Sequence, residues 1–247
     1  MNKGEFYSRD INYKSWGYDN YYGLQDIQKY NDERYVLDRE LILNKTFYNK
    51  IFKQQGNFVN YIITYSPHTP FTTEKEVGKI LAEEKYGKGN VPKLSEEDCA
   101  KMAASETDNM VGLLIQALKD NGLYDNTVIV AYADHYLYTL DDKSILDKYK
   151  ETSNNLINHT PFFIWSSDLG QLTSISKVNM QMDILPTVLN LFGIDYNSNN
   201  YIGHDILSND FKGYAFFSDY SWYDGKVYVE NQQITNGKKM SKNKLDS

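Results

Sequence analysis

The stretch of sequence that indicates the fold most clearly is residues 127–136, which read TVIVAYADHY. Its β-branched and aromatic residues are typical of a buried strand, and its length suits a parallel sheet. The strand ends in a carboxylate and an imidazole, Asp134 and His135, and both groups bind divalent metals. Open α/β sheets bind ligands at the carboxyl ends of their strands, which is where this pair is expected. A second interpretation stays open: Asp134 caps a turn, and His135 is a structural histidine.

Strands and helices alternate along the rest of the chain. Hydrophobic periodicity predicts strands at residues 58–65 and 160–165, and helices at residues 32–53, 95–120 and 181–192. The segment 72–94 is charged, with scattered glycines, and is expected to be a loop or a weak helix. This alternation predicts an α/β fold with a mostly parallel sheet flanked by helices.

Near Gly213 the pattern changes from alternating strands and helices to short apolar runs separated by turn signals. Short apolar runs at residues 214–217 and 225–229, with turn signals at residues 224–225 and 236–237, predict a small antiparallel unit. We therefore expect a main domain at residues 1–212 and a small antiparallel subdomain with a basic tail at residues 213–247.

The composition of the chain bears on its expected partners, on disulfide bonds and on membrane spans. The chain has 247 residues, enough for one sizeable core, and 26 basic against 33 acidic residues give a net charge of −7. No stripe of Lys and Arg interleaved with aromatic residues is present, so nucleic acid is not an expected partner. The lone Cys99 cannot form an internal disulfide and is interpreted as structural. No apolar stretch reaches the roughly 18–20 residues of a membrane span, and no signal peptide opens the sequence.

Two further side chains are candidates for substrate binding. His68 lies between two prolines just after the predicted strand at residues 58–65, so in a parallel sheet it faces the same edge as Asp134 and His135. Arg9 lies close to aromatic residues, and a guanidinium matches phosphate oxygens bidentately. The alternatives are a structural His68 in a turn and a surface Arg9 paired with Asp10. His159 and His204 are weaker candidates, on a rim and in a surface loop.

An ordered set of motifs resembles the lipoteichoic acid synthase family, phosphoglycerol transferases of the sulfatase and alkaline phosphatase superfamily. The resemblance covers roughly residues 2–230. Each motif alone is weak, but their order is specific. The motifs are FYSR at 6–9, YKSWGYD at 13–19, SPHTPF at 66–71, DNGLYDNT at 120–127, YADHY at 132–136, TPFFI at 160–164, MDILPTVL at 182–189, GID at 193–195 and GHDIL at 203–207.

The resemblance assigns roles to four residues. It implies that Asp134 and His135 ligate a divalent metal, usually manganese, and that His68 and Arg9 contact the glycerol phosphate. The implied fold is sulfatase-like. The implied substrates are phosphatidylglycerol and a growing glycerol phosphate polymer, and the implied location is the outer face of a bacterial membrane or the extracellular side.

The sequence also departs from the family pattern. The family's threonine nucleophile, a metal-binding glutamate, a further substrate-contacting histidine, the first sheet strands and the membrane anchor have no counterpart, because all of them would precede Met1. We therefore expect the C-terminal part of such an enzyme, with two of four metal ligands and no catalytic activity of its own. Ala133 and the sequence YLY at residues 136–138 replace residues that are often glycine or serine in the family.

Three other hypotheses remain at this stage. The first is another enzyme of the superfamily: a sulfatase, a phosphodiesterase or a phosphoethanolamine transferase. The second is a non-catalytic module that binds glycerol phosphate. The third is a degenerate product without a function of its own, since the loss of sheet strands exposes edges and core.

Overall fold

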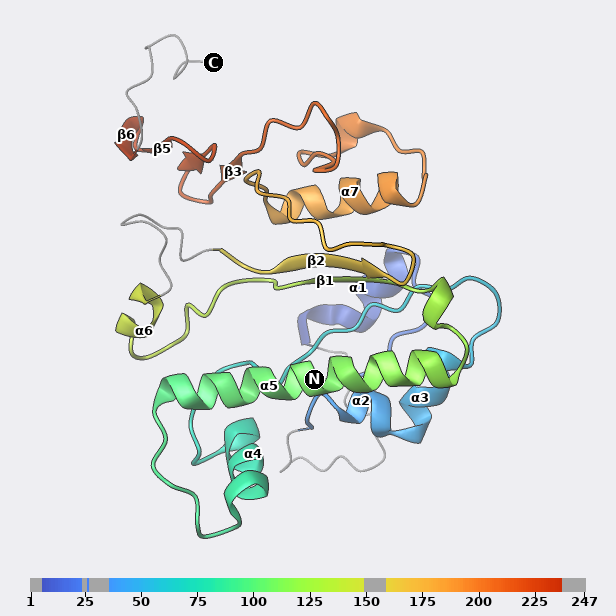
Figure 1. Cartoon of the computed structure of the whole chain (residues 1–247), viewed down its shortest axis with the longest axis vertical. Coiled ribbons are helices and arrows are strands. Elements are labelled where there is room, and N and C mark those ends of the chain that lie inside the picture. The colour runs from blue at the N-terminus through green and yellow to red at the C-terminus, as the bar shows by residue number, and fades with distance from the viewer. Residues whose placement is uncertain (1–5, 24–25, 27–35, 149–158, 237–247) are drawn as a thin grey trace. The chain divides into compact units, whose positions relative to one another are not determined.

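The computed structural model describes residues 6–23, 26, 36–148 and 159–236 (Figure 1). The chain divides into two compact units. The first unit comprises residues 1–131, 137–148 and 163–168, and the second comprises residues 132–136, 149–162 and 169–247. Helices and strands alternate along the described residues, which agrees with the α/β class expected from the sequence.

The first unit is built around one long helix. Its helices are α1 (Arg9–Ser15), α2 (Glu40–Leu43), α3 (Lys45–Phe52), α4 (Glu76–Tyr86), α5 (Glu96–Asp120) and α6 (Ser144–Asp147), with short 3-10 turns at Phe6–Ser8 and Tyr124–Asn126. Figure 1 shows α5, in green, with α2 and α3 beside one part of it and α4 beside another.

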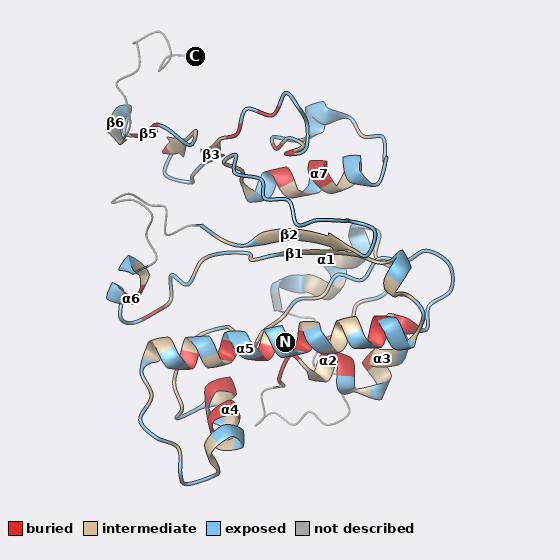
Figure 2. Ribbon diagram, in the orientation of Figure 1, coloured by how far each residue is buried: buried red, intermediate tan, exposed pale blue. Residues whose placement is uncertain are grey.

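Helix α5 begins and packs as its sequence predicts. The hydroxyl oxygen of Ser95 accepts a hydrogen bond from the backbone N–H of Asp98, which satisfies one of the unpaired donors of the first turn. One face then buries Met110, Ala117 and Leu118 against α2 and α3 (Figure 2). The buried face of α5 thus agrees with the hydrophobic periodicity that predicted a helix at residues 95–120.

The predicted helix at residues 32–53 is interrupted. Residues 27–35 lie outside the described residues, and the remainder forms α2 and α3, separated at Asn44. The backbone of Asn44 is extended, with ψ at 119°, and its side chain accepts from the N–H of Thr46. Asn44 therefore ends one helix and caps the next. The segment 72–94, expected to be a loop or a weak helix, contains α4.

Two predicted strands are present and pair with each other. They are β1 (Val128–Tyr132) and β2 (Phe162–Ser166). The N–H of Ala133, just after β1, bonds the carbonyl of Pro161, just before β2, and the two strands run in opposite directions in Figure 1. This pair is therefore antiparallel, whereas the sequence of β1 suggested a parallel neighbour. A buried apolar run fits either arrangement, because periodicity alone does not fix the direction of the partner.

Residues 58–65 are not a strand, so that prediction is wrong for the described structure. Ile62 packs on the same core cluster as Ile129 of β1, while Val59 and Ile63 are exposed. The strand-like side-chain pattern is present, but a strand also needs a ladder of backbone hydrogen bonds with a neighbour. No such ladder is assigned to this segment within the described part of the chain.

In its described residues, the second unit contains one α-helix and one small sheet. The helix α7 (Ile184–Leu191) follows a 3-10 turn, η5 (Gln181–Asp183), and ends before Gly193, whose φ is +63°. The sheet has four antiparallel strands in the order β3 (Ala215–Phe216), β4 (Trp222–Tyr223), β5 (Tyr228–Glu230) and β6 (Gln233–Asn236). An antiparallel sheet therefore occupies the region where one was predicted. The basic tail at residues 238–244 lies outside the described residues.

Candidate functional site

The predicted metal pair lies directly after β1, in the second unit. The Nε2 atom of His135 is 3.6 Å from the Oδ1 atom of Asp134, so the two side chains point toward one another. Their exposed fractions are 41% for His135 and 85% for Asp134. Both side chains are thus accessible from solvent, so a metal ion and a substrate can reach them.

A backbone hydrogen bond orients the His135 ring. Its Nδ1 atom is 2.9 Å from the carbonyl oxygen of Tyr136. A carbonyl only accepts, so Nδ1 carries a proton, and in the neutral ring the lone pair lies on Nε2. Histidines that bind metals are commonly fixed in this way, with one ring nitrogen donating to a carbonyl and the other facing the metal.

Gln181 fixes the backbone of the same segment. Its side-chain amide nitrogen donates to the carbonyls of Ala133 and Asp134, at 2.7 Å in each case. Gln181 is the first residue of η5, so this turn holds the peptide that carries the pair. Sequence reasoning missed Gln181, because nothing in its neighbourhood distinguishes it from any other residue at the start of a helix.

A buried polar network fixes η5 in turn. Asp183 is 1% exposed and accepts from the N–H groups of Met180 and His204. Thr187, fully buried, donates to the carbonyl of Asp183 and accepts from the N–H of Ile206. These bonds attach residues 203–206 to the start of α7, which accounts for the motif at residues 203–207 without a ligand role for the exposed His204.

Gly203 is required by a close backbone approach in this network. A Cβ atom at this position would lie 1.9 Å from the carbonyl oxygen of Met182, a distance that real Cβ atoms do not reach. Any larger residue must therefore displace η5, which also holds Gln181.

The donor atoms of Asp134 and His135 fit a shared divalent cation. Metal bonds to imidazole nitrogen and carboxylate oxygen are about 2.0–2.2 Å long, so two donors of one ion lie at most about 4 Å apart. The separation of 3.6 Å falls within that limit. Among the described residues no group of three or more His, Cys, Asp or Glu side chains gathers in this way. The described part of the chain therefore supplies a pair of ligands rather than a full set.

His68 lies in an exposed loop of the first unit. Its Nδ1 atom is 2.7 Å from the carbonyl oxygen of Thr69, and its ring stacks on Tyr65 with the centroids 5.2 Å apart and the planes 11° apart. The backbone N–H of His68 also bonds the carbonyl of Tyr65 at 2.9 Å. As in His135, Nδ1 carries a proton and Nε2 carries the lone pair of the neutral ring.

Arg9 is the first residue of α1, also in the first unit. The two residues before it, Tyr7 and Ser8, have φ values of +55° and +51°. Left-handed conformations of this kind are costly for such residues and are concentrated at functional sites. Tyr7 is 76% exposed. The pKa of Tyr21 is raised above its ordinary value. Burial causes the rise, and the positive charge of Arg9 opposes it in part.

The four predicted residues are therefore divided between the units. Asp134 and His135 are brought together in the second unit, and Arg9 and His68 lie in the first. Their convergence on one pocket remains a prediction.

Cys99 is 2% exposed, and burial raises its pKa, which agrees with a structural role. Among the described residues no helix is long and apolar enough to cross a membrane.

The family of this chain emerges from comparison with known proteins. The sequence model of the sulfatase family matches residues 1–194. The chain is 30% identical to a lipoteichoic acid synthase of Staphylococcus saprophyticus over 90% of its own length and 35% of that protein. It is also 30% identical to the lipoteichoic acid synthase of Staphylococcus aureus USA300, over 93% of its length and 37% of that protein. The chain thus spans little more than a third of these relatives.

A solved structure supports the same fold. The crystal structure of the lipoteichoic acid synthase LtaP from Listeria monocytogenes matches with a TM-score of 0.77 and 24% identity, over 100% of this chain and 64% of that one. This likeness bears on the fold, which is sulfatase-like as the motifs implied. With most of its length matched by the family model, the chain belongs to the sulfatase family.

Proposed function

We propose that this chain forms part of a metal-dependent phosphoglycerol transferase that acts on phosphatidylglycerol head groups. Asp134 and His135 would bind the metal, manganese by resemblance, and Arg9 and His68 would bind the glycerol phosphate. The observation that carries the proposal is the convergence of His135 Nε2 and Asp134 Oδ1 at 3.6 Å. It is supported by the names of the relatives, which are lipoteichoic acid synthases.

The chemistry of the four residues suits such a reaction. A divalent metal held by Asp134 and His135 would supply positive charge to a phosphoryl group and lower the pKa of an attacking hydroxyl. Arg9 offers a planar set of donors that pairs with two phosphate oxygens at once. His68, with Nδ1 bonded to Thr69, presents Nε2 as an acceptor for a glycerol hydroxyl. Both residues act by holding the substrate in position.

The location follows from the same proposal. Phosphatidylglycerol and the glycerol phosphate polymer would be met at the outer face of a bacterial membrane. The resemblance implies a threonine nucleophile, and we propose that it is not among these 247 residues. We therefore expect the isolated polypeptide, given Mn²⁺ and phosphatidylglycerol, to release no diacylglycerol. Clear turnover would refute that expectation.

Calorimetric titration with glycerol 3-phosphate, with and without Mn²⁺, tests the binding part of the proposal. We expect binding that is tighter with Mn²⁺ and that Arg9→Ala weakens at least tenfold, the order of one charge-assisted hydrogen bond. Lys14→Ala is the matched control, because it removes an exposed cation from the same helix. Absence of binding, or equal losses in the two variants, would contradict the proposal.

A second candidate is a binding module without catalysis. The observation in its favour is that the described residues bring together a pair of metal donors and no larger group. The test measures glycerol 3-phosphate binding and turnover with longer polypeptides that contain residues 6–236. Binding without turnover in all of them would favour this candidate. Cleavage of an aryl sulfate or of phosphatidylethanolamine in preference to phosphatidylglycerol would instead indicate another enzyme of the superfamily.

A further inference from the structure

A buried carboxylate lies behind the loop that carries His68. Asp38, at the turn before α2, is 2% exposed. Its Oδ1 atom accepts from the backbone N–H groups of Tyr65, at 2.7 Å, and Ser66, at 3.1 Å. These donors belong to residues 65–70, which we call the His68 loop. A charged acceptor is well suited to this place, since hydrogen bonds to ionised groups are about twice as strong as neutral ones.

The contact between the turn and the loop is reciprocal. The hydroxyl oxygen of the fully buried Ser66 accepts from the N–H of Asp38 at 3.0 Å. The second carboxylate oxygen of Asp38 accepts from the hydroxyl of Thr107 at 2.6 Å, and Thr107 belongs to α5. Asp38 therefore joins the His68 loop to the longest helix of the unit.

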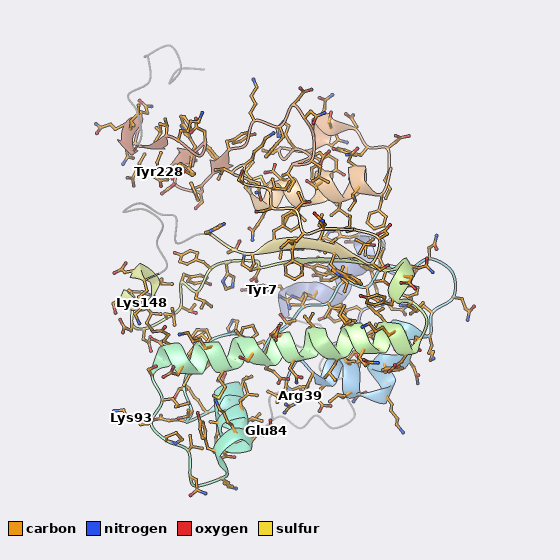
Figure 3. The ribbon with its side chains drawn as sticks, in the orientation of Figure 1. Tyr7, Arg39, Glu84, Lys93, Lys148 and Tyr228 are labelled. Carbon is orange, nitrogen blue, oxygen red and sulfur yellow. The ribbon has the colours of Figure 1, made fainter. Side chains whose placement is uncertain are left out.

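The turn that contains Asp38 is itself fixed to two helices. The N–H of Arg39 donates to Glu106 of α5 at 3.1 Å, and the guanidinium of Arg39 contacts Glu106 at 3.3 Å. The same guanidinium bonds both oxygens of Glu84 of α4, at 2.6 and 2.5 Å (Figure 3). The position of Asp38 is thus fixed by α4 and α5 as well as by its bond to Ser66.

Tyr65 transmits this position to His68. Its N–H is bonded to Asp38, its carbonyl accepts from the N–H of His68, and its ring stacks on the imidazole. A shift of Tyr65 therefore moves both the backbone and the ring of His68. The side chain of His68 is also held by the bond from Nδ1 to the carbonyl of Thr69.

We infer that Asp38, supported by Thr107, is a positioning residue for His68, and that it sets the geometry with which the imidazole meets a glycerol phosphate. This inference rests on the proposed function, in which His68 contacts that ligand. A residue with a purely structural role would alter stability alone. A positioning residue also alters ligand affinity and the environment of the imidazole while the chain remains folded.

The test is nuclear magnetic resonance of the histidine side chains during titration of the folded chain with glycerol 3-phosphate. His68→Gln identifies the His68 signals, which we expect the ring current of the stacked Tyr65 to shift in the unaltered chain. We expect Asp38→Asn to weaken affinity about tenfold or more and to reduce the ring-current shift, because the amide places a donor against N–H donors. Thr107→Val should do the same to a smaller extent, and Thr107→Ser, which keeps the hydroxyl, should restore both.

The variants separate failure of the inference from failure of the proposed function. Ser105→Ala, which removes an exposed hydroxyl from α5, is the control and should change neither measurement. If His68→Gln leaves affinity unchanged, the proposed role of His68 fails, and the ring-current shift in Thr107→Val still decides whether Asp38 positions the ring. If His68→Gln weakens affinity while folded Asp38→Asn and Thr107→Val match the unaltered chain, the inference is wrong. Should Asp38→Asn not fold, Thr107→Val alone decides.

Discussion

The side chains that directly contact the candidate site segments differ between the two units. In the first unit, a buried carboxyl group, Asp38, supports the His68 loop. In the second, a neutral side chain, Gln181, bonds the backbone carbonyls of Ala133 and Asp134 beside the metal pair. The difference teaches where each site is vulnerable. Removal of the buried carboxyl group of Asp38 should lower the stability of the whole unit. Removal of the exposed, neutral contact of Gln181 should change the local geometry more than the stability of the fold.

The largest expected effect is loss of the buried carboxylate in the first unit. Asp38→Ala leaves two backbone N–H groups and the hydroxyl of Thr107 without their acceptor. We expect the free energy of unfolding to fall by about 3–5 kcal/mol, because each buried donor left without an acceptor costs about 1–3 kcal/mol. Urea unfolding followed by circular dichroism measures this. Asp108→Ala, an exposed site on α5, should change it by less than about 0.5 kcal/mol. Equal losses in the two variants would remove the contrast between the units.

The second effect concerns the close approach at Gly203. Gly203→Ala places a Cβ atom against the Met182 carbonyl and must displace η5, at a cost of about 1–3 kcal/mol. Because η5 carries Gln181, we also expect weaker Mn²⁺ binding. The control is Gly170→Ala, where a Cβ would meet nothing within 4 Å. Unchanged stability together with unchanged Mn²⁺ affinity would show that the network does not fix the metal pair.

A smaller effect isolates the neutral contact. Gln181→Ala removes both bonds to the peptide that carries Asp134, and we expect Mn²⁺ affinity to fall about tenfold with little change in stability. Electron paramagnetic resonance of free Mn²⁺ during titration gives the affinity. A large fall in stability, of the size expected for Asp38→Ala, would mean that the two units rely on the same kind of support.

The smallest effect is a difference in pH dependence. Burial raises the pKa of Glu106 above its ordinary value, whereas hydrogen bonds from Ser221 lower the pKa of Asp219 in the second unit. The folded state thus holds the proton of Glu106 more tightly than the unfolded state. The stability contributed by this group is present below its unfolded pKa and is lost as pH rises through the raised value. For Asp219, stability is present above the unfolded pKa and is lost as pH falls through the lowered value.

Paired stability profiles between pH 3 and 8 test these signs, a range chosen to bracket ordinary carboxyl values of roughly 4. Relative to the unaltered chain, Glu106→Gln should remove a decline on the rising-pH side, and Asp219→Asn should remove a decline on the acid side. The same sign for both variants would contradict the assignment of causes.

Much of the secondary structure was predictable from local pattern, and the exceptions have physical reasons. The start of α5 at Ser95 follows from its capping residue, and β1 and β2 follow from their apolar runs. The segment 58–65 has a strand-like pattern but no ladder within the described residues, since pairing depends on a neighbour that local sequence does not specify. The direction of β2 was not predictable for the same reason.

The candidate site divides in the same way. The candidate metal pair could be proposed because two ligand side chains are adjacent at the end of an apolar run. Adjacency alone does not make them converge, since successive residues of a strand point to opposite faces, so the separation of 3.6 Å had to come from the structure. Gln181 and Asp38 were not identifiable, because each bonds a residue far along the chain. Gln181 lies 47 positions from Asp134, and Asp38 lies 27 positions from Tyr65. Such contacts depend on tertiary packing, which the pattern around either residue does not reveal.

The most direct test of the account is pulsed electron paramagnetic resonance of the Mn²⁺-loaded chain, which detects nitrogen nuclei bonded to the ion. We predict modulation from the ¹⁴N of one histidine, abolished by His135→Gln and preserved by His204→Gln, together with loss of tight Mn²⁺ binding in Asp134→Asn but not in the exposed control Asp195→Asn. Mn²⁺ bound without a nitrogen ligand, or nitrogen modulation that persists in His135→Gln, would contradict the claim that Asp134 and His135 hold one cation.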